Sequence, residues 1–162
     1  MFRTTLISAA FLCSLVAGFL FAFAAVVMPG IRRLTDGDFI RAFQVIDRVI
    51  QNNQPLFMLM WVGSVLSLLA AAVLGIWTLL GADRLLVIVA VLIYLLCVQL
   101  PTMIVNIPLN NALRKLSPST MNETARKQAR VDFEQRWNRW NVFRTVGASL
   151  ASFLLMLLLL RV

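Results

Sequence analysis

The sequence predicts an all-α membrane protein: a bundle of four transmembrane helices, with amphipathic helices in its two long loops. Of its 162 residues, 60% are hydrophobic and only 14% are charged, which is too apolar for a soluble domain of this length. Four apolar stretches each reach the roughly 20 residues that a helix needs to cross a bilayer. None of them alternates apolar and polar residues as the strands of a membrane barrel do. We therefore expect one membrane domain over residues 1–162.

The first apolar stretch covers about residues 5–28 and resembles a secretory signal peptide only superficially. Its apolar core is longer than that of a signal peptide, and Arg3 is the only charge before it. We expect this span to be retained. Pro29 and Gly30 are expected to end it, because proline cannot continue the helical hydrogen bonds and glycine accommodates a turn.

The first long loop carries the signature of a helix. Thr35 is followed three residues later by Asp38, an arrangement typical of a helix N-terminal cap. Apolar residues then recur at helical spacing over about residues 38–51, with polar residues on the other faces. We predict an amphipathic helix whose apolar face consists of Phe39, Phe43, Ile46 and Ile50.

The second and third apolar stretches, about residues 56–80 and 85–105, are separated by Gly81-Ala82-Asp83-Arg84. A connection this short predicts that the two helices are antiparallel neighbours. The third span ends in a polar stripe at helical spacing. Amides facing lipid are unfavourable, so the stripe should face the bundle; it consists of Gln99, Thr102, Asn106 and Asn110.

The last part of the chain contains a charged helix over about residues 122–141 and an apolar span over about 142–160. One continuous helix and a break near Asn141 are both compatible with the sequence. Where the charged segment meets the span, an aromatic and polar face recurs at i, i+3, i+4 and i+7, formed by Trp137, Trp140, Asn141 and Arg144. Such residues either anchor a helix end at the bilayer surface or form a site. We expect an Asn of the third span, Asn106 or Asn110, to bond Asn141 or Arg144.

The basic residues are distributed unevenly about the four spans. Only Arg3, Arg84 and Arg161 flank the spans on the side of the two termini, whereas twelve others lie on the side of the two long loops. The positive-inside rule therefore predicts cytoplasmic loops and external termini, in a bacterial inner membrane. A net charge of +8 that flanks membrane spans indicates contact with membrane lipids, and it is a poor match to nucleic acid.

The chain has no histidine, and its two cysteines, Cys13 and Cys97, do not form a paired motif. The commonest ligands for metal and haem are therefore missing. We expect no metal site and no cofactor. The oligomeric state is left open.

Three motifs occur in order along the chain: Gln44-Val-Ile-Asp47-Arg48, Asn106-Ile-Pro-Leu-Asn110, and the segment from Trp137 to Thr145. With them, the chain resembles the anthrone-oxygenase-like family of small integral membrane proteins over nearly its whole length. Members near polyketide pathways oxidise anthrones to anthraquinones without metal or flavin. The resemblance thus implies a flat, lipophilic aromatic substrate.

The residues are compatible with that activity. Arg144, Asn141, Asn106 and Asn110 are expected to hold the substrate oxyanion, and the rings of Trp137 and Trp140 to stack on it. Without histidine, only Asp47 or water is available as a base. We expect the rest of the substrate pocket to include Gln44, Asp47, Arg48, Trp61, Gln99 and Thr102.

Other functions fit the sequence as well. A non-catalytic membrane protein that binds a lipid, a quinone or a partner helix has the same features, and the polar stripe would then serve only to join helices. A small multidrug-type transporter is disfavoured because no Asp, Glu, Lys or His lies in the middle of a span. A haem protein would have to use Met or Cys as the iron ligand.

Overall fold

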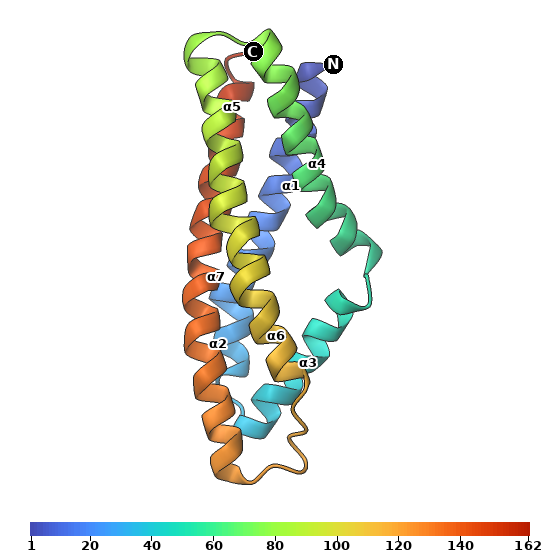
Figure 1. The fold of residues 1–162 in the computed structure, drawn as a ribbon, viewed down its shortest axis with the longest axis vertical. Helices are drawn as coiled ribbons and strands as arrows, with labels where there is room; N and C mark the ends of the chain where they lie inside the picture. The colour runs from blue at the N-terminus through green and yellow to red at the C-terminus, as the bar shows by residue number, and fades with distance from the viewer.

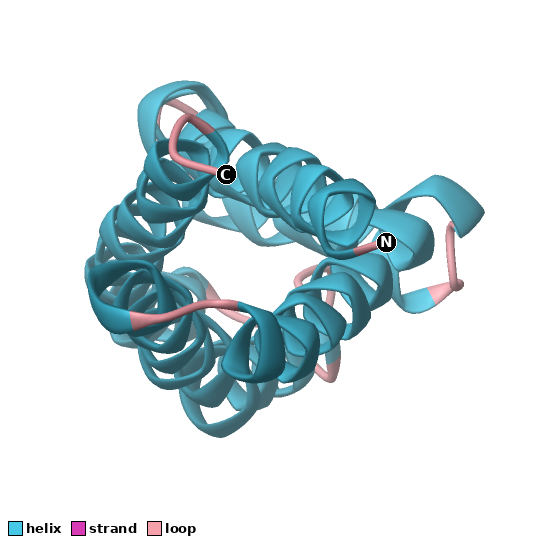
Figure 2. Ribbon diagram, turned by 90° about the horizontal axis from the view of Figure 1, so that it is seen from above, coloured by secondary structure: helices cyan, strands magenta, loops and turns pink.

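The computed structural model describes all 162 residues and contains only helices and short connections (Figures 1 and 2). This confirms the predicted all-α bundle. Four helical segments are long and apolar enough to cross a membrane: Phe2–Ile31, Pro55–Thr78, Gly81–Arg114 and Glu123–Leu159.

The first rod runs through α1 (Phe2–Ala22), a π-helical turn η1 (Phe23–Val27) and α2 (Met28–Ile31). It therefore continues past Pro29, and the expectation that Pro29 and Gly30 end this span was wrong. Proline has no N–H and its ring crowds the carbonyl of the residue four positions earlier. The extra residue of a π-helical turn relieves that conflict without ending the helix.

The third rod contains two such π-helical turns, each followed by a proline. It runs through α5 (Gly81–Tyr94), η2 (Leu95–Gln99), η3 (Thr102–Asn106) and α6 (Ile107–Arg114). Pro101 follows η2 and Pro108 follows η3, each two residues after the end of the π-helical turn, as Pro29 follows η1. The two π-helical turns thus keep this helix continuous past its prolines but offset its faces, and the second offset falls within the polar stripe.

Helix α3 (Asp36–Gln51) begins as predicted, with Thr35 as its N-cap: the backbone N–H of Asp38 donates to Thr35 Oγ1 at 3.3 Å. Its buried face consists of Phe39, Ile40, Phe43 and Asp47. The helix α4 (Pro55–Thr78) follows after a three-residue connection. In Figure 1, α3 and the beginning of α4 both project away from the bundle to meet at this connection.

Helices α4 and α5 are joined by Leu79 and Leu80 alone. The predicted turn over residues 81–84 is instead the first turn of α5, which opens at Gly81 with a φ of +52°. That left-handed conformation suits glycine.

Helix α7 (Glu123–Leu159) is a single helix of 37 residues, which resolves the alternative of a break near Asn141. At 1.5 Å per residue it is about 55 Å long, well beyond the roughly 30 Å of bilayer hydrocarbon. Its charged first half therefore extends past the membrane.

The helices enclose two apolar cores. The larger one lies toward the termini and joins α1, α4, α5 and α7. The smaller one lies toward the loops and includes Phe39, Phe43, Phe133 and Trp137. Helix α7 approaches the π-helical turn η2 very closely, since a Cβ added at Gly147 would lie 2.7 Å from that of Cys97.

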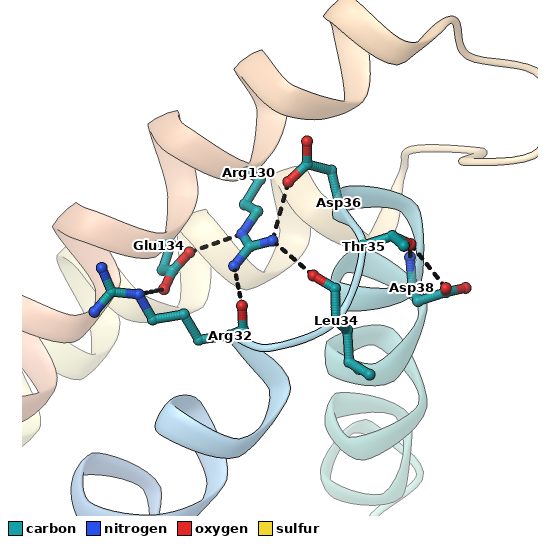
Figure 3. Close-up of polar contacts among 7 residues, drawn as sticks. All are labelled: Arg32, Leu34, Thr35, Asp36, Asp38, Arg130 and Glu134. Carbon is teal, nitrogen blue, oxygen red and sulfur yellow. Dashed lines mark hydrogen bonds and ion pairs between the residues drawn. The ribbon is translucent and has the colours of Figure 1, made fainter.

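An ionic cluster fastens α7 to the connection between α2 and α3 (Figure 3). Arg130 donates to Asp36 Oδ1 at 3.0 Å, to Glu134 Oε2 at 2.9 Å and to two backbone carbonyls of the connection, those of Arg32 and Leu34. The guanidinium also lies 4.6 Å from the ring centroid of Phe39. This cluster holds α3, which carries Asp47, against α7.

Candidate functional site

A cavity of about 260 Å³ lies where the two apolar cores meet. This is close to the lower end of the range of small-molecule pockets, which begins at roughly 300 Å³. All four membrane-length segments and α3 contribute to its wall, and eleven of its nineteen lining residues are hydrophobic. The polar and indole side chains in the wall are Asp47, Gln51, Asn53, Trp61, Thr102, Asn106, Asn110, Trp137, Asn141 and Arg144.

Arg144 is the only cationic residue in the wall of this cavity, and it is 4% exposed. It lies about 22 Å along α7 from Leu159, inside the length of helix that hydrocarbon would cover. No carboxylate pairs with it. A buried guanidinium without a counter-ion is costly and creates a strong local preference for an anion.

Two neighbours fix the orientation of this guanidinium. Arg144 Nη1 donates to Thr102 Oγ1 and Nη2 donates to Asn141 Oδ1, both at 2.9 Å. The amide of Asn141 in turn donates to the carbonyl of Leu20 in α1 at 3.0 Å. The expected bond from Asn106 or Asn110 to Arg144 or Asn141 was wrong, because Thr102, one turn earlier on the same stripe, is the acceptor.

Asp47 is a carboxylate in the wall of the same cavity, contributed by α3 and 3% exposed. Its Oδ1 accepts from Asn110 Nδ2 at 2.9 Å, and Asn110 Oδ1 accepts from Trp137 Nε1 at 2.8 Å. Burial raises the pKa of the Asp47 carboxyl; the bond from Asn110 and the charge of Arg114 oppose that rise but do not cancel it. A carboxylate in this situation is a stronger base than an exposed Asp.

Several buried polar atoms in the cavity wall have no hydrogen-bond partner within the protein. They are Asp47 Oδ2, Arg144 Nε and both amide atoms of Asn106. Buried polar groups are nearly always satisfied, so unsatisfied atoms that gather around one cavity need a common explanation. A polar ligand or ordered water within the cavity would supply the missing partners.

The apolar wall is largely aromatic. The ring of Trp137 lies 5.6 Å from that of Phe23 and 5.5 Å from that of Phe43, measured between centroids. Trp61 stacks on Phe57 at 5.5 Å with 20° between the planes, and its Nε1 donates to Gln99 Oε1 at 3.1 Å. Rings held in fixed orientations on opposite helices are suited to a flat ligand.

Four of the residues that the sequence predicted for the pocket do not line the cavity. Trp140 packs edge-on against Phe143 on the outer side of α7, and Arg48 is exposed. Gln44 and Gln99 contact residues near the cavity without lining it. Gln44 donates to the backbone carbonyls of Leu113 and Leu116, and Gln99 Oε1 accepts from the indole of Trp61, which does line it. The other eight predicted residues line one cavity.

The first span also contributes to the cavity, which was not predicted from the sequence. Phe19 and Leu20 of α1 and Phe23 of η1 line the cavity, as does Phe57 at the start of α4. The available signal was the i, i+4 spacing of the pairs Phe19/Phe23 and Phe57/Trp61, which places two rings on one helix face.

The cavity wall combines a buried cation, a buried carboxylate and several aromatic rings. No group of three or more His, Cys, Asp or Glu side chains in the structure is placed to hold a metal ion. Arg144 is suited to bind an oxyanion and Asp47 to accept a proton, and the aromatic side chains form most of the apolar wall around them.

The anthrone oxygenase family model matches residues 47–155. No curated protein and no solved structure matches the chain. The matched segment begins at Asp47 and includes the other polar residues of the cavity wall as well as most of three of the four spans. It covers well over half of the chain, which therefore belongs to the anthrone oxygenase family.

Proposed function

We propose that this membrane protein oxidises a flat, lipophilic anthrone-type phenol in the cavity between Asp47 and Arg144, using dioxygen. The observation that carries this proposal is the buried guanidinium of Arg144, which has no carboxylate partner, in a cavity whose apolar wall is largely aromatic. The anion that it is suited to bind is one that carries its own apolar surface, such as an ionised polycyclic phenol.

The reaction begins with a proton transfer. An anthrone carries a carbonyl on one side of its central ring and a methylene on the other. Asp47 takes a proton from the methylene, and the negative charge appears on the carbonyl oxygen, where Arg144 stabilises it. The rise in the pKa of Asp47 that burial causes makes this carboxylate a better proton acceptor.

The ionised substrate then delivers electrons to dioxygen. A C–O bond forms at the former methylene carbon, and the resulting peroxide takes up the proton held by Asp47. Asp47 then removes the second proton from that carbon, the O–O bond breaks, and a carbonyl forms as hydroxide leaves. The hydroxide takes up that proton from Asp47 and is released as water. One dioxygen is consumed per anthrone, one oxygen atom entering the quinone and the other leaving as water.

The amide of Asn106 is suited to donate a hydrogen bond to the oxygen that develops negative charge during these steps. Its amide is 2% exposed, lines the cavity and has no partner in the protein. A donor that is already oriented and has no bond to break stabilises a developing charge efficiently.

The test is an anthrone oxidation assay on purified protein in detergent or lipid nanodiscs, with oxygen uptake and quinone formation measured together. We expect equal amounts of both. Asp47→Asn should abolish turnover while still binding the quinone product, because it removes the base but keeps the shape. Arg144→Lys should lose most activity, because lysine keeps the charge but not the planar fork that reaches two acceptors at once.

Matched controls lie outside the cavity. Asp132→Asn and Arg139→Lys change exposed residues of α7 that do not line it, and Trp140→Phe changes an indole on the other side of that helix. All three should oxidise anthrone at close to the wild-type rate. Tight binding of flat phenols or quinones without any oxygen uptake would contradict catalysis and favour a non-catalytic binding protein.

A further inference from the structure

A second hollow lies on the outside of the bundle, next to the cavity. It is a groove of about 720 Å³ between α1, α3 and the beginning of α4, and twelve of its thirteen lining residues are hydrophobic. Phe11 and Leu15 of α1, Val49 of α3 and Leu59 of α4 are among the exposed apolar side chains in it. Gln54 is its one polar lining residue.

The groove faces bilayer hydrocarbon. Its α1 side extends from Phe11 to Phe19, while the whole rod from Phe2 to Ile31 is about 45 Å long. These residues thus lie within about 8 Å of the middle of the rod, and the hydrocarbon extends about 15 Å on either side of its own centre. An apolar groove at this depth is bathed by lipid tails.

Only side chains separate the groove from the cavity. Phe19, Ile46, Ile50 and Phe57 line both hollows, and together we term them the shared wall. The rings of Phe19 and Phe57 meet edge to face with centroids 5.4 Å apart. The backbones on either side diverge here, because α3 and the beginning of α4 project away from the bundle (Figure 1). A direct route between the two hollows therefore runs through the side chains of the shared wall.

We propose that the groove is the membrane-side binding site through which the ligand reaches the cavity, and that the shared wall is its gate. This rests on the proposed function, which requires a flat lipophilic phenol. Such a molecule partitions into hydrocarbon, so it arrives from the bilayer and binds first in the apolar groove. It then passes between Phe19 and Phe57 to reach Arg144 and Asp47, and the gate closes behind it to exclude lipid tails.

The test measures access to the cavity without using the ligand. Asn106→Cys places one thiol in the cavity, in a chain whose own cysteines are replaced (Cys13→Ala, Cys97→Ala), reconstituted in phospholipid nanodiscs. The probes are pyrene maleimide, which dissolves in the bilayer, and a disulfonated maleimide, which remains in water. We expect the thiol to react with the bilayer-dissolved reagent much faster than with the charged one.

Variants of the shared wall should change that rate in opposite directions. Phe57→Ala widens the gate and should raise the rate of pyrene maleimide labelling severalfold, and Phe19→Ala provides a second widening variant from the other helix. Ile50→Trp narrows the gate and should lower the rate. Phe21→Ala is the matched control, because Phe21 is an exposed ring on α1 that lines neither hollow. It should leave the rate unchanged.

Equal labelling by both reagents, or wall variants that behave like Phe21→Ala in monodisperse protein, would overturn the gate and indicate entry from water. The outcome is independent of turnover. If the Asn106→Cys variant labels as expected but the wild-type protein does not oxidise anthrone, the gate stands and the proposed function is refuted. If the wild-type protein oxidises anthrone but the variant does not label as expected, only the gate is refuted.

Discussion

A guanidinium between membrane helices lowers stability unless its charge and its donors are satisfied. Arg144 meets only part of that requirement, because Thr102 and Asn141 accept two of its hydrogen bonds while Nε has no partner and no carboxylate lies within ion-pair distance. Interfacial anchoring does not explain the residue either, since an anchoring arginine extends toward headgroups and this one is buried. We therefore propose that the protein retains Arg144 to bind an anion.

Arg144→Met tests that explanation by separating stability from binding. Methionine fills a similar space without the charge, so thermal stability in detergent should stay the same or rise. Affinity for an ionised hydroxyanthraquinone should fall by about tenfold or more, since a hydrogen bond to a charged group is worth roughly 1.5–3 kcal/mol. A large loss of thermal stability would instead indicate a structural role for Arg144.

Asp47 leads to a prediction about pH. Its pKa is raised in the folded protein, so the folded state holds this proton more tightly than the unfolded chain does. The resulting stability is complete below about pH 4, the ordinary range of an Asp carboxyl, and is lost as the pH rises through the raised pKa. Asp47→Asn should flatten this part of the curve of unfolding free energy against pH.

The activity should also depend on the ionisation of Asp47, but it should rise with pH where the stability falls. Because only the ionised carboxylate accepts a proton, kcat/KM for anthrone should increase as the pH rises through the pKa of Asp47. A profile that is flat from acid to neutral pH in the wild-type protein would remove Asp47 from the role of base.

Individual site residues were predictable where a helical period linked them. The face containing Trp137, Asn141 and Arg144 and the stripe containing Thr102 and Asn106 both turn toward the cavity. The prediction for Trp140 was wrong. A step of three residues rotates the side chain by about 300° around the helix axis, so Trp140 points about 60° away from Trp137, which is enough to take it out of the cavity wall. The pairing of Arg144 with Thr102 was not predictable, because it depends on the π-helical turns in the facing helix.

At the scale of elements, the three π-helical turns are the least expected feature. Sequence rules treat proline as a helix terminator, yet Pro29, Pro101 and Pro108 all lie inside continuous rods. In a membrane the broken backbone bonds cannot be left to water, so a local widening of the helix is favoured over a chain break. The amphipathic helix α3 and the four spans were predictable, because hydrophobic period and length determine them.

Pro108→Ala should show that the turn η3 positions the site. Alanine restores the missing N–H, so η3 is expected to relax to an α-helix and rotate residues before it by about 100° relative to those after it. Thr102 then cannot bond Arg144 while Asn110 still bonds Asp47. Ligand affinity should fall by about tenfold or more, with thermal stability unchanged or higher.

Pro55→Ala is the control for this experiment. Pro55 stands in the first turn of α4, where no π-helical turn precedes it and its missing N–H would be unpaired in any case. It should leave affinity nearly unchanged. Equal effects of Pro55→Ala and Pro108→Ala would contradict a specific role for η3.

At the scale of the whole molecule, both termini lie at one end, and the other end contains α3, α6 and the first half of α7, which carry most of the basic residues (Figure 1). The cavity is closer to the basic end, where the Arg130 cluster ties α3 to α7 (Figure 3). The positive-inside rule predicts that this end is cytoplasmic.

The orientation can be tested by labelling single cysteines in membranes. A cysteine at Ser119 should react with an impermeant reagent only from the cytoplasm, and one added after Val162 only from outside. The reverse pattern would invert the orientation.

The central claim is that the cavity binds the ionised form of a flat phenol against Arg144. The absorption spectrum of a hydroxyanthraquinone bound to the purified protein tests it most directly, because the colour of this ligand changes when its phenol ionises. At a pH where the free ligand is neutral, we expect the wild-type complex to absorb as the phenolate and the Arg144→Met complex, at saturating ligand, to absorb as the phenol. A wild-type complex with the spectrum of the neutral phenol, or no binding at all, would contradict the claim.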